Sequence, residues 1–95
     1  MFEIKKDVNR EIRLIGRFDA AQTDKARSFL NQINETAILN LENLDYISSA
    51  GLGVLVMVQK RLKEKGNQII LKGMNNHVKE IFMIARFDLI FEIKD

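Results

Sequence analysis

Apolar and polar residues alternate at the start of the chain, and this pattern predicts two strands. Phe2 and Ile4 are separated by a polar residue, and the segment Glu11 to Phe18 places Ile12 and Leu14 on one face. The polar residues between these segments indicate a turn. We therefore expect the two strands to form a β-hairpin, with the turn type left open.

The segment after the hairpin has the spacing of an amphipathic helix. Its apolar positions fall at i, i+3, i+4 and i+7, namely Ala26, Phe29, Leu30 and Ile33. We expect this helix to begin between Ala21 and Asp24. Thr23 or Asp19 can serve as its N-cap, because both side chains accept hydrogen bonds from free backbone N–H groups.

Two further helices are predicted downstream. One starts within Ser48 to Gly53 and runs to about Lys65, where Gly66 is typical of a helix C-terminus. Its main apolar stripe comprises Leu52, Leu55, Val56 and Leu62. Asn75 or Asn76 can cap the other, whose apolar face comprises Val78, Ile81, Phe82 and Ala85. Three methionines are expected at the core or its edge rather than in a binding groove: Met57, Met74 and Met83.

Three more apolar runs predict strands. Ala37 to Leu41 is so apolar that we expect both of its faces to be covered. Gln68 to Lys72 is a short strand, and Leu89 to Ile93 is a final edge strand. The resulting order β-β-α-β-α-β-α-β predicts an α/β fold. Its mixed β-sheet has four to five strands with helices packed on it and right-handed crossovers.

Composition and charge exclude several function classes. The 95 residues form a single expected domain, residues 1–95. The chain has no Cys and one His, so a disulfide framework, a thiolate nucleophile and a multi-histidine metal site are excluded within it, and no cofactor or metal is expected. Basic and acidic residues are interleaved along the chain and sum to a net charge of +2, which disfavours nucleic-acid binding. The longest uncharged apolar run, Ser48 to Val58, is too short for membrane insertion, so we expect a cytoplasmic protein.

The segment from Asp45 to Gly53 carries the most chemistry. A strand ends there, and two hydroxyls and three small residues precede a helix. Ser48 or Ser49 lies at the positive end of that helix, a position suited to phosphate. From the residues alone, a plain N-cap with glycines for packing is the simpler interpretation, because capping serines are common. The segment matches neither a phosphate-binding Gly-Lys-Ser/Thr loop nor the Gly-x-Ser-x-Gly elbow of hydrolases.

Leu44 to Leu55 resembles the signature of the bacterial anti-sigma factor antagonists, the STAS-domain family. In that signature, an apolar pair, Asp, Ser and a small residue precede Gly-Leu-Gly or Gly-Leu-Arg. Three other segments resemble the family's strand ends: Gly16 to Asp19, Ile38 to Leu41 and Phe87 to Phe91. The resemblance extends over nearly the whole chain and implies a STAS-like fold.

The resemblance also implies site residues. The family's phosphoacceptor serine falls on Ser49, and Ser48 stands where the family usually has Asp. Ser48 is therefore the fallback acceptor. Asp19 matches an acidic residue near the family's partner-binding surface. The partner-binding residues implied by the resemblance are Asp19, Ser48, Ser49, Ala50, Gly51, Leu52 and Gly53.

The function implied by this resemblance is that of a partner switch and not of an enzyme. The unphosphorylated domain binds an anti-sigma factor that is also a serine protein kinase, and so releases its target. Phosphorylation ends the complex, and a serine phosphatase resets it. The alternative is a STAS-like docking subunit of a lipid or anion transport assembly. A small nucleotide- or nucleic-acid-binding domain is a distant third hypothesis.

The end of the chain adds one expectation about assembly. Many relatives carry another helix after the last strand. Without one, apolar surface near Ile90 and Ile93 is expected to be covered by a weak homodimer.

Overall fold

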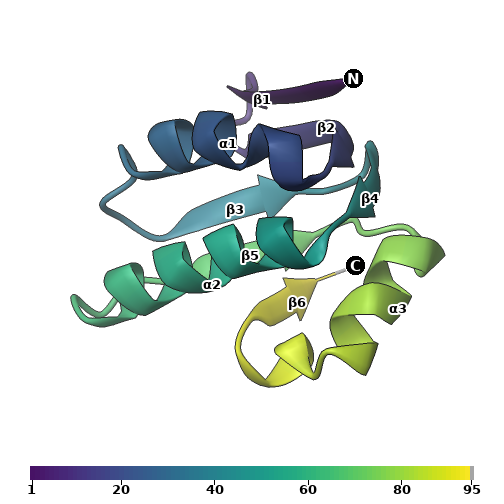
Figure 1. Ribbon diagram of the computed structural model, residues 1–95. Helices are drawn as coiled ribbons and strands as arrows, with labels where there is room; N and C mark the ends of the chain where they lie inside the picture. Colours follow the sequence, from purple (N-terminus) through teal and green to yellow (C-terminus); the bar gives the residue numbers. More distant parts are fainter. Residues whose placement is uncertain (95) are drawn as a thin grey trace.

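A computed structural model describes residues 1–94 of the chain, in which helices lie against a mixed sheet (Figure 1). The α/β class and the mixed sheet are confirmed. The helices, with two short 3-10 helices η1 and η2, are η1 (Ala20–Gln22), α1 (Thr23–Leu30), α2 (Ser49–Lys63), α3 (Asn76–Ile84) and η2 (Phe87–Leu89). The strands are β1 (Phe2–Lys6), β2 (Ile12–Phe18), β3 (Ala37–Asn40), β4 (Leu44–Ile47), β5 (Ile69–Lys72) and β6 (Glu92–Lys94).

Strand β2 organises the sheet. It pairs antiparallel with β1, as the hairpin pattern predicts. On its other edge it pairs in parallel with β3 at Ile12 and Arg13, and then with β4 from Gly16 to Phe18. The sheet order is β1-β2-β3-β5-β6, with β4 beside β2. There are six strands rather than four or five, because β3 and β4 form two consecutive short strands along the single edge of β2.

A bulge at Gly16 allows β2 to pair with both β3 and β4. The register with β4 shifts between Gly16 and Arg17, and Gly16 has φ of 91°. The N–H of Gly16 donates to the carbonyl of Asn43, and the N–H of Arg17 donates to that of Met1, both at 2.9 Å. A Cβ at Gly16 would collide with the Met1 carbonyl, so both conformation and space favour glycine there.

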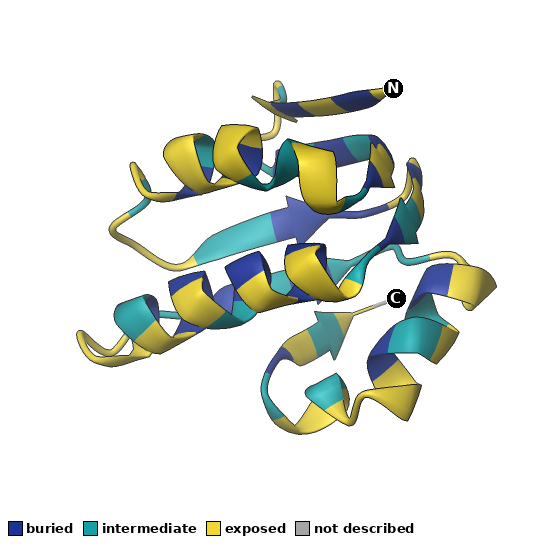
Figure 2. Ribbon diagram, in the orientation of Figure 1, coloured by how far each residue is buried: buried dark blue, intermediate teal, exposed yellow. Residues whose placement is uncertain are grey.

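The core lies on one face of the sheet. Along β2 and β5 the residues facing the helices are buried, whereas those on the other face are mostly half-buried. Figure 2 shows the buried residues of α1 and α2 turned toward the sheet. The expectation that Ala37 to Leu41 is covered on both faces holds only in part, since on the outer face Asn40 alone is buried. Ile38 is only half-buried, and ion pairs occupy the neighbouring positions of that outer face.

The outer face is stabilised by two anchored carboxylates. Glu11 accepts from Lys72 Nζ at 2.8 Å and from Asn40 Nδ2 at 3.0 Å, and these bonds, led by that of Lys72, lower its pKa. Burial raises the pKa of Asp7, but hydrogen bonds from the Arg13 side chain and from two backbone N–H groups outweigh it. The pKa of Asp7 therefore also lies below its ordinary value.

The helix termini agree with the expected positions in most cases. α1 begins at Thr23, inside the expected interval, although it ends at Leu30 and leaves Ile33 outside. At the end of α2, the N–H of Gly66 donates to Lys63 O and that of Asn67 donates to Leu62 O, both typical of a glycine-terminated helix. Asn75 caps α3 by accepting from the Val78 N–H at 2.8 Å.

Three expectations about side chains and strands are wrong. Met57 and Met83 are exposed, while Met74 packs against the core. Leu89 belongs to η2 and is exposed, so the last strand starts later, at Glu92. Short apolar runs do not distinguish a strand from a helical turn by periodicity alone, which explains the last error.

Candidate functional site

The candidate site lies where α2 starts, beyond the carboxyl ends of β2 and β4. The N–H of Ser48 donates to the carbonyl of Phe18 at 2.9 Å, and Phe18 is the last residue of β2. This bond brings Asp19, the next residue, to the same edge of the sheet as the two serines. Sites in parallel sheets usually lie at this edge.

The two serines have different environments. Ser48 is the N-cap: its Oγ accepts from the Gly51 N–H at 3.1 Å, and the residue is half-buried. Ser49 is the first residue of α2 and is exposed. Within residues 1–94 the Ser49 hydroxyl forms no hydrogen bond. The capping role deduced from the sequence thus falls on Ser48, which leaves the Ser49 hydroxyl accessible from solvent.

Two glycines of the site also differ. Gly51 is buried, and a Cβ there would lie 3.0 Å from Ile47 Cγ1 and 3.1 Å from both Phe18 Cγ and Phe18 O. Gly51 therefore allows α2 to pack closely on the strand ends. A Cβ at Gly53 would meet nothing within 4 Å. Packing within this chain therefore explains Gly51 and does not explain Gly53.

Asp19 caps the short helix η1 rather than α1. Its Oδ1 accepts from the Ala21 N–H at 3.1 Å. The expected N-cap Thr23 instead donates its hydroxyl to the Ala20 carbonyl. Asp19 is half-buried, and η1 packs beside α2, so the carboxylate lies at the rim of the surface that carries Ser49.

Of the seven residues expected at the site, the structure exposes three on the outside of α2: Ser49, Ala50 and Gly53. Leu52 is 8% exposed and belongs to the core, and Gly51 is buried. These two residues fix the position of the helix and present little surface. Ser48 and Asp19 are half-buried, so their exposure is intermediate between those of the two groups.

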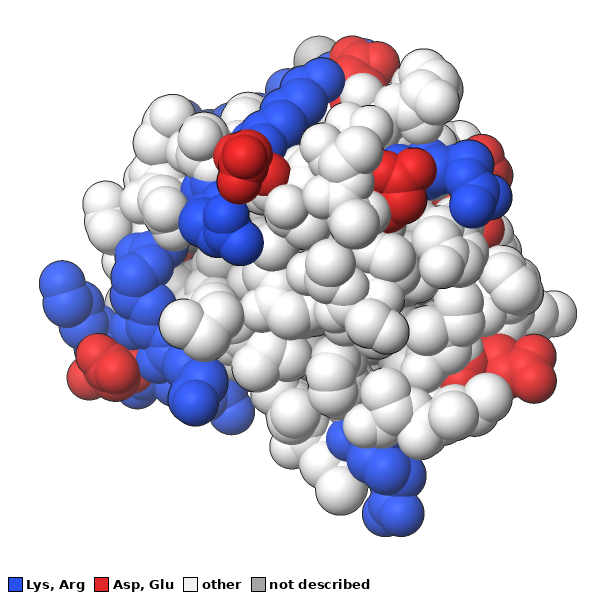
Figure 3. All heavy atoms as spheres, in the orientation of Figure 1, with Lys and Arg blue, Asp and Glu red and all other residues white. Residues whose placement is uncertain are grey.

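Charge is distributed unevenly along α2. Its first turn has no acidic residue, and its last turn carries Lys60, Arg61 and Lys63. Figure 3 shows an uncharged surface over the first part of α2 and basic side chains gathered at its far end. The positive end of the helix dipole is therefore not neutralised by a side chain of its own first turn, which suits it to an added anion.

Exposed apolar residues occur on α2, at the end of α3 and in η2, and the sequence interpretation missed them. Met57 is 67% exposed and lies on the helix face of Ser49 and Gly53, because the three are four residues apart. Ile84 and Leu89, near the end of α3 and in η2, are also exposed. The four-residue spacing is visible in the sequence, from which Met57 is nevertheless expected in the core.

No helix within residues 1–94 has both the length and the apolar character needed to cross a bilayer. The same residues contain no cluster of three or more His, Cys, Asp or Glu side chains able to hold a metal ion.

Comparisons with known proteins identify relatives of this chain. BtrV of Bordetella bronchiseptica, provisionally named an anti-sigma factor antagonist, is 39% identical over 74 residues. These cover 78% of this chain and 58% of that relative, so the chain spans less than two thirds of its length. The anti-sigma-B factor antagonist of Listeria monocytogenes is 29% identical over 89 residues, which are 90% of this chain and 78% of the relative.

A solved structure and a sequence profile extend the comparison. The anti-sigma factor antagonist SpoIIAA in its unphosphorylated form has the same fold, with a TM-score of 0.75 and 24% identity over 98% of this chain and 87% of SpoIIAA. The profile of the STAS domain matches residues 2–95. Because this match covers nearly the whole chain and the fold agrees with it, the protein belongs to the STAS domain family.

Proposed function

We propose that this protein is an anti-sigma factor antagonist that works as a partner switch. In its unphosphorylated form it binds an anti-sigma factor with serine kinase activity, and phosphorylation of Ser49 ends the complex. A serine phosphatase restores the binding form. The names of the relatives support the general function. The accessible, unpartnered Ser49 hydroxyl at the start of α2 is the observation that supports the switch.

Ser49 is favoured over Ser48 as the acceptor because the two hydroxyls differ in availability. Transfer to Ser48 requires the Oγ that accepts from the Gly51 N–H. Modification there removes or distorts the cap and introduces a bulky group at a half-buried position. Modification at Ser49 leaves the cap in place. The exposed side chain also lets a kinase approach without local unfolding.

The proposed docking surface consists of Asp19 at its rim and of Ser49, Ala50 and Gly53 on the outside of α2. Small side chains allow a partner backbone to approach the helix closely. Gly53 supports this role, because an exposed helical glycine costs about 1 kcal/mol relative to alanine. Among residues 1–94, no packing of a Gly53 neighbour offsets that cost.

Phosphate at Ser49 changes this surface without changing the fold. It adds a charge of about −1.5 to −2 at neutral pH. The free N–H groups and the dipole of α2 stabilise that charge on the protein's own side. A partner packed closely against Ala50 and Gly53 loses contact, because the new group is bulky and strongly hydrated. The complex is expected to dissociate while the unfolding midpoint stays nearly constant.

Intact-mass measurement with site mapping on protein purified from its native host tests the acceptor. One phosphate on Ser49, absent from the Ser49→Ala variant and retained by Ser48→Ala, is the expected result. A phosphate on Ser48 moves the acceptor and keeps the switch. Protein that stays unmodified, and that copurifies with a membrane transporter, overturns the proposal in favour of a docking subunit.

Binding is tested separately from phosphorylation. The anti-sigma factor is first isolated from the native host by its binding to the unphosphorylated protein. It should then bind Ser49→Ala as it binds the natural protein and should bind Ser49→Asp much more weakly. Lys63→Ala is the matched control, because Lys63 lies on the same helix at its opposite end. Equal binding by Ser49→Asp and the natural protein contradicts the proposed exclusion.

A further inference from the structure

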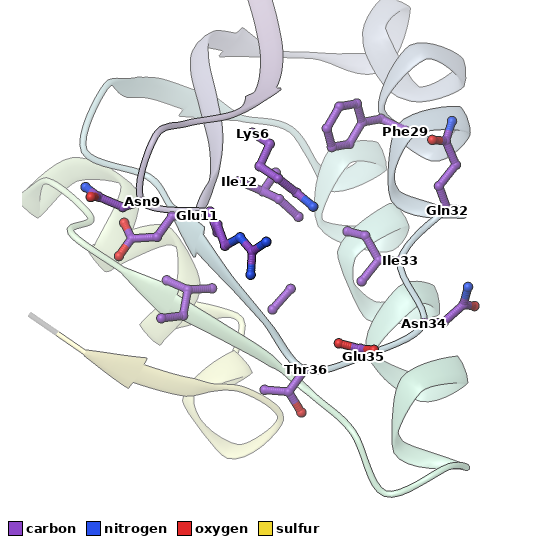
Figure 4. Close-up of a pocket in the computed structure, with 13 residues that line it drawn as sticks. Lys6, Asn9, Glu11, Ile12, Phe29, Gln32, Ile33, Asn34, Glu35 and Thr36 are labelled. Carbon is purple, nitrogen blue, oxygen red and sulfur yellow. The ribbon is translucent and has the colours of Figure 1, made fainter.

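A concave surface lies at the opposite end of the parallel strands from Ser49. It is a cavity of about 860 Å³, between the β1–β2 turn and the segment that joins α1 to β3. This volume falls within the range of small-molecule sites. Figure 4 shows Lys6, Phe29 and Ile33 around the same space, contributed by β1, α1 and the loop after α1.

Part of the cavity wall is apolar, and polar or charged residues make up the rest of its lining. Ile12 forms its buried floor at 2% exposed, and three apolar side chains on the helix side of the sheet are half-buried, so that carbon atoms face the open space. These three are Phe29, Ile33 and Ala37. An apolar ligand placed against this wall removes hydrocarbon from water on both sides, which favours binding.

The rim of the cavity carries two basic side chains, Lys6 and Arg10. Neither forms a hydrogen bond or an ion pair within residues 1–94. The lining residue Glu11 does not neutralise them, because Lys72 and Asn40 hold its carboxylate. Glu35 also lines the cavity but forms no ion pair with either cation within the described residues.

The position of each cation is unusual for its residue type. Lys6 occupies the inward-facing row of β1, in register with buried Ile12. A charge at the inward position of an edge strand can protect that edge from pairing with a strand of another molecule. This role accounts for Lys6 but not for Arg10. Arg10 has φ of 66°, a left-handed conformation that glycine or asparagine adopts more easily. Edge protection does not explain an arginine at this turn position.

The turn holds Arg10 in that conformation through Asp7. The Arg10 N–H donates to the Asp7 carbonyl at 3.0 Å, and Asp7 Oδ1 accepts from the N–H groups of Asn9 and Glu11. The Arg13 side chain in turn fixes the Asp7 carboxylate at 2.9 Å. Arg10 is therefore presented at the cavity rim by an ordered turn, and the strain at this residue directs attention to its side chain.

From this arrangement we propose that the cavity binds a small amphipathic carboxylate. Its apolar body lies against Phe29, Ile33 and Ala37, and its carboxylate lies between Lys6 and Arg10. Two unpaired cations beside the apolar part of the wall complement such a ligand in both charge and polarity. The proposal is independent of the partner switch, because Ser49 and the cavity lie at opposite ends of the parallel strands.

Decanoate, used below its micelle concentration, is the probe, and amide NMR spectra of the full chain report its position. Saturable shifts are expected at residues 6–12 and 29–38, with none at 48–53. The neutral methyl ester and decylammonium should bind much more weakly. Shifts centred elsewhere, no saturation, or equal binding of decylammonium overturn the proposal. Binding of a short acidic peptide in place of decanoate also overturns it, because the cavity is then a protein-docking site.

The chain offers a matched pair of arginine variants. Arg10→Gly suits the positive φ, so the fold is expected to persist, and decanoate affinity should fall about tenfold. Arg86→Gly removes the same charge from a residue with φ of 61° that does not line the cavity, and it should leave the affinity unchanged. Equal weakening by both variants indicates a nonspecific effect of net charge and contradicts the site.

Discussion

The two sides of the first turns of α2 use the same residue types for opposite purposes. On the inner side, Ser48 caps the helix and Gly51 lets it pack on Phe18. On the outer side, Ser49 has no hydrogen-bond partner within residues 1–94 and Gly53 has open space. The inner pair therefore contributes to stability, whereas the outer pair makes no corresponding contact within the described part of the chain. Residue type by itself does not reveal function here, because position on the helix decides it.

The two glycines should show the largest difference in the free energy of unfolding when each is replaced by alanine. Gly51→Ala brings a Cβ within 3.1 Å of the Phe18 carbonyl, which already accepts from Ser48 and has little freedom to move. We expect a loss of about 1–2 kcal/mol in the free energy of unfolding, measured by urea denaturation. Unchanged or increased stability of Gly51→Ala contradicts the close packing of α2 on the strand ends.

The serines give the next largest difference. Ser48→Ala removes the side chain that accepts from the Gly51 N–H, and this should lower the free energy of unfolding by about 1 kcal/mol. Ser49→Ala removes no hydrogen bond within the described chain and should change it by less than about 0.5 kcal/mol. If thermal melts show the two variants equally destabilised, the assignment of separate roles to the serines is wrong.

Gly53→Ala should act in the opposite direction to Gly51→Ala. Alanine adds helix propensity and its Cβ meets no neighbour, so the free energy of unfolding should rise by up to about 1 kcal/mol. The same urea experiment measures it. A loss of stability instead shows that some contact within the chain, not partner binding, accounts for this glycine.

The smallest expected effect concerns the pH dependence of the free energy of unfolding. This dependence should come from the outer face of the sheet and not from either side of α2. The pKa of Glu11 and that of Asp7 are lowered in the folded protein. Their stabilisation is complete above the ordinary carboxyl pKa of about 4 and is lost as pH falls through the lowered values. Glu11→Gln should flatten the decline of stability with acid, measured by urea denaturation at a series of pH values. Ser49→Ala should keep the natural slope, and a changed slope there contradicts the separation.

Much of the fold could be predicted from the sequence because its signals are local. The alternation of Phe2 and Ile4 and the cap at Asn75 depend on neighbouring residues only. The division into β3 and β4 could not be predicted, because it depends on a bulge at Gly16, far away in the sequence. Met57 was misassigned because an exposed apolar residue and a buried one look alike in sequence.

The candidate site, which remains a proposal, was predictable to a similar degree. The small-residue segment located it, and the resemblance to a family selected Ser49 from two adjacent serines. The division of labour between those serines needed the hydrogen bond to Gly51. The cavity at the other end could not be predicted, because Lys6 and Arg10 are surrounded by other charges in the sequence. Their lack of acidic partners within residues 1–94 becomes visible only in three dimensions.

The place of β2 between β1 on one edge and both β3 and β4 on the other has a consequence for hydrogen exchange. Opening the protein at either end leaves part of β2 paired, since its partners come from different segments of the chain. The amide protons in its middle should therefore exchange only when the whole molecule unfolds. Those protons provide an internal gauge of global stability, while β6, at the edge of the sheet, should exchange through local opening.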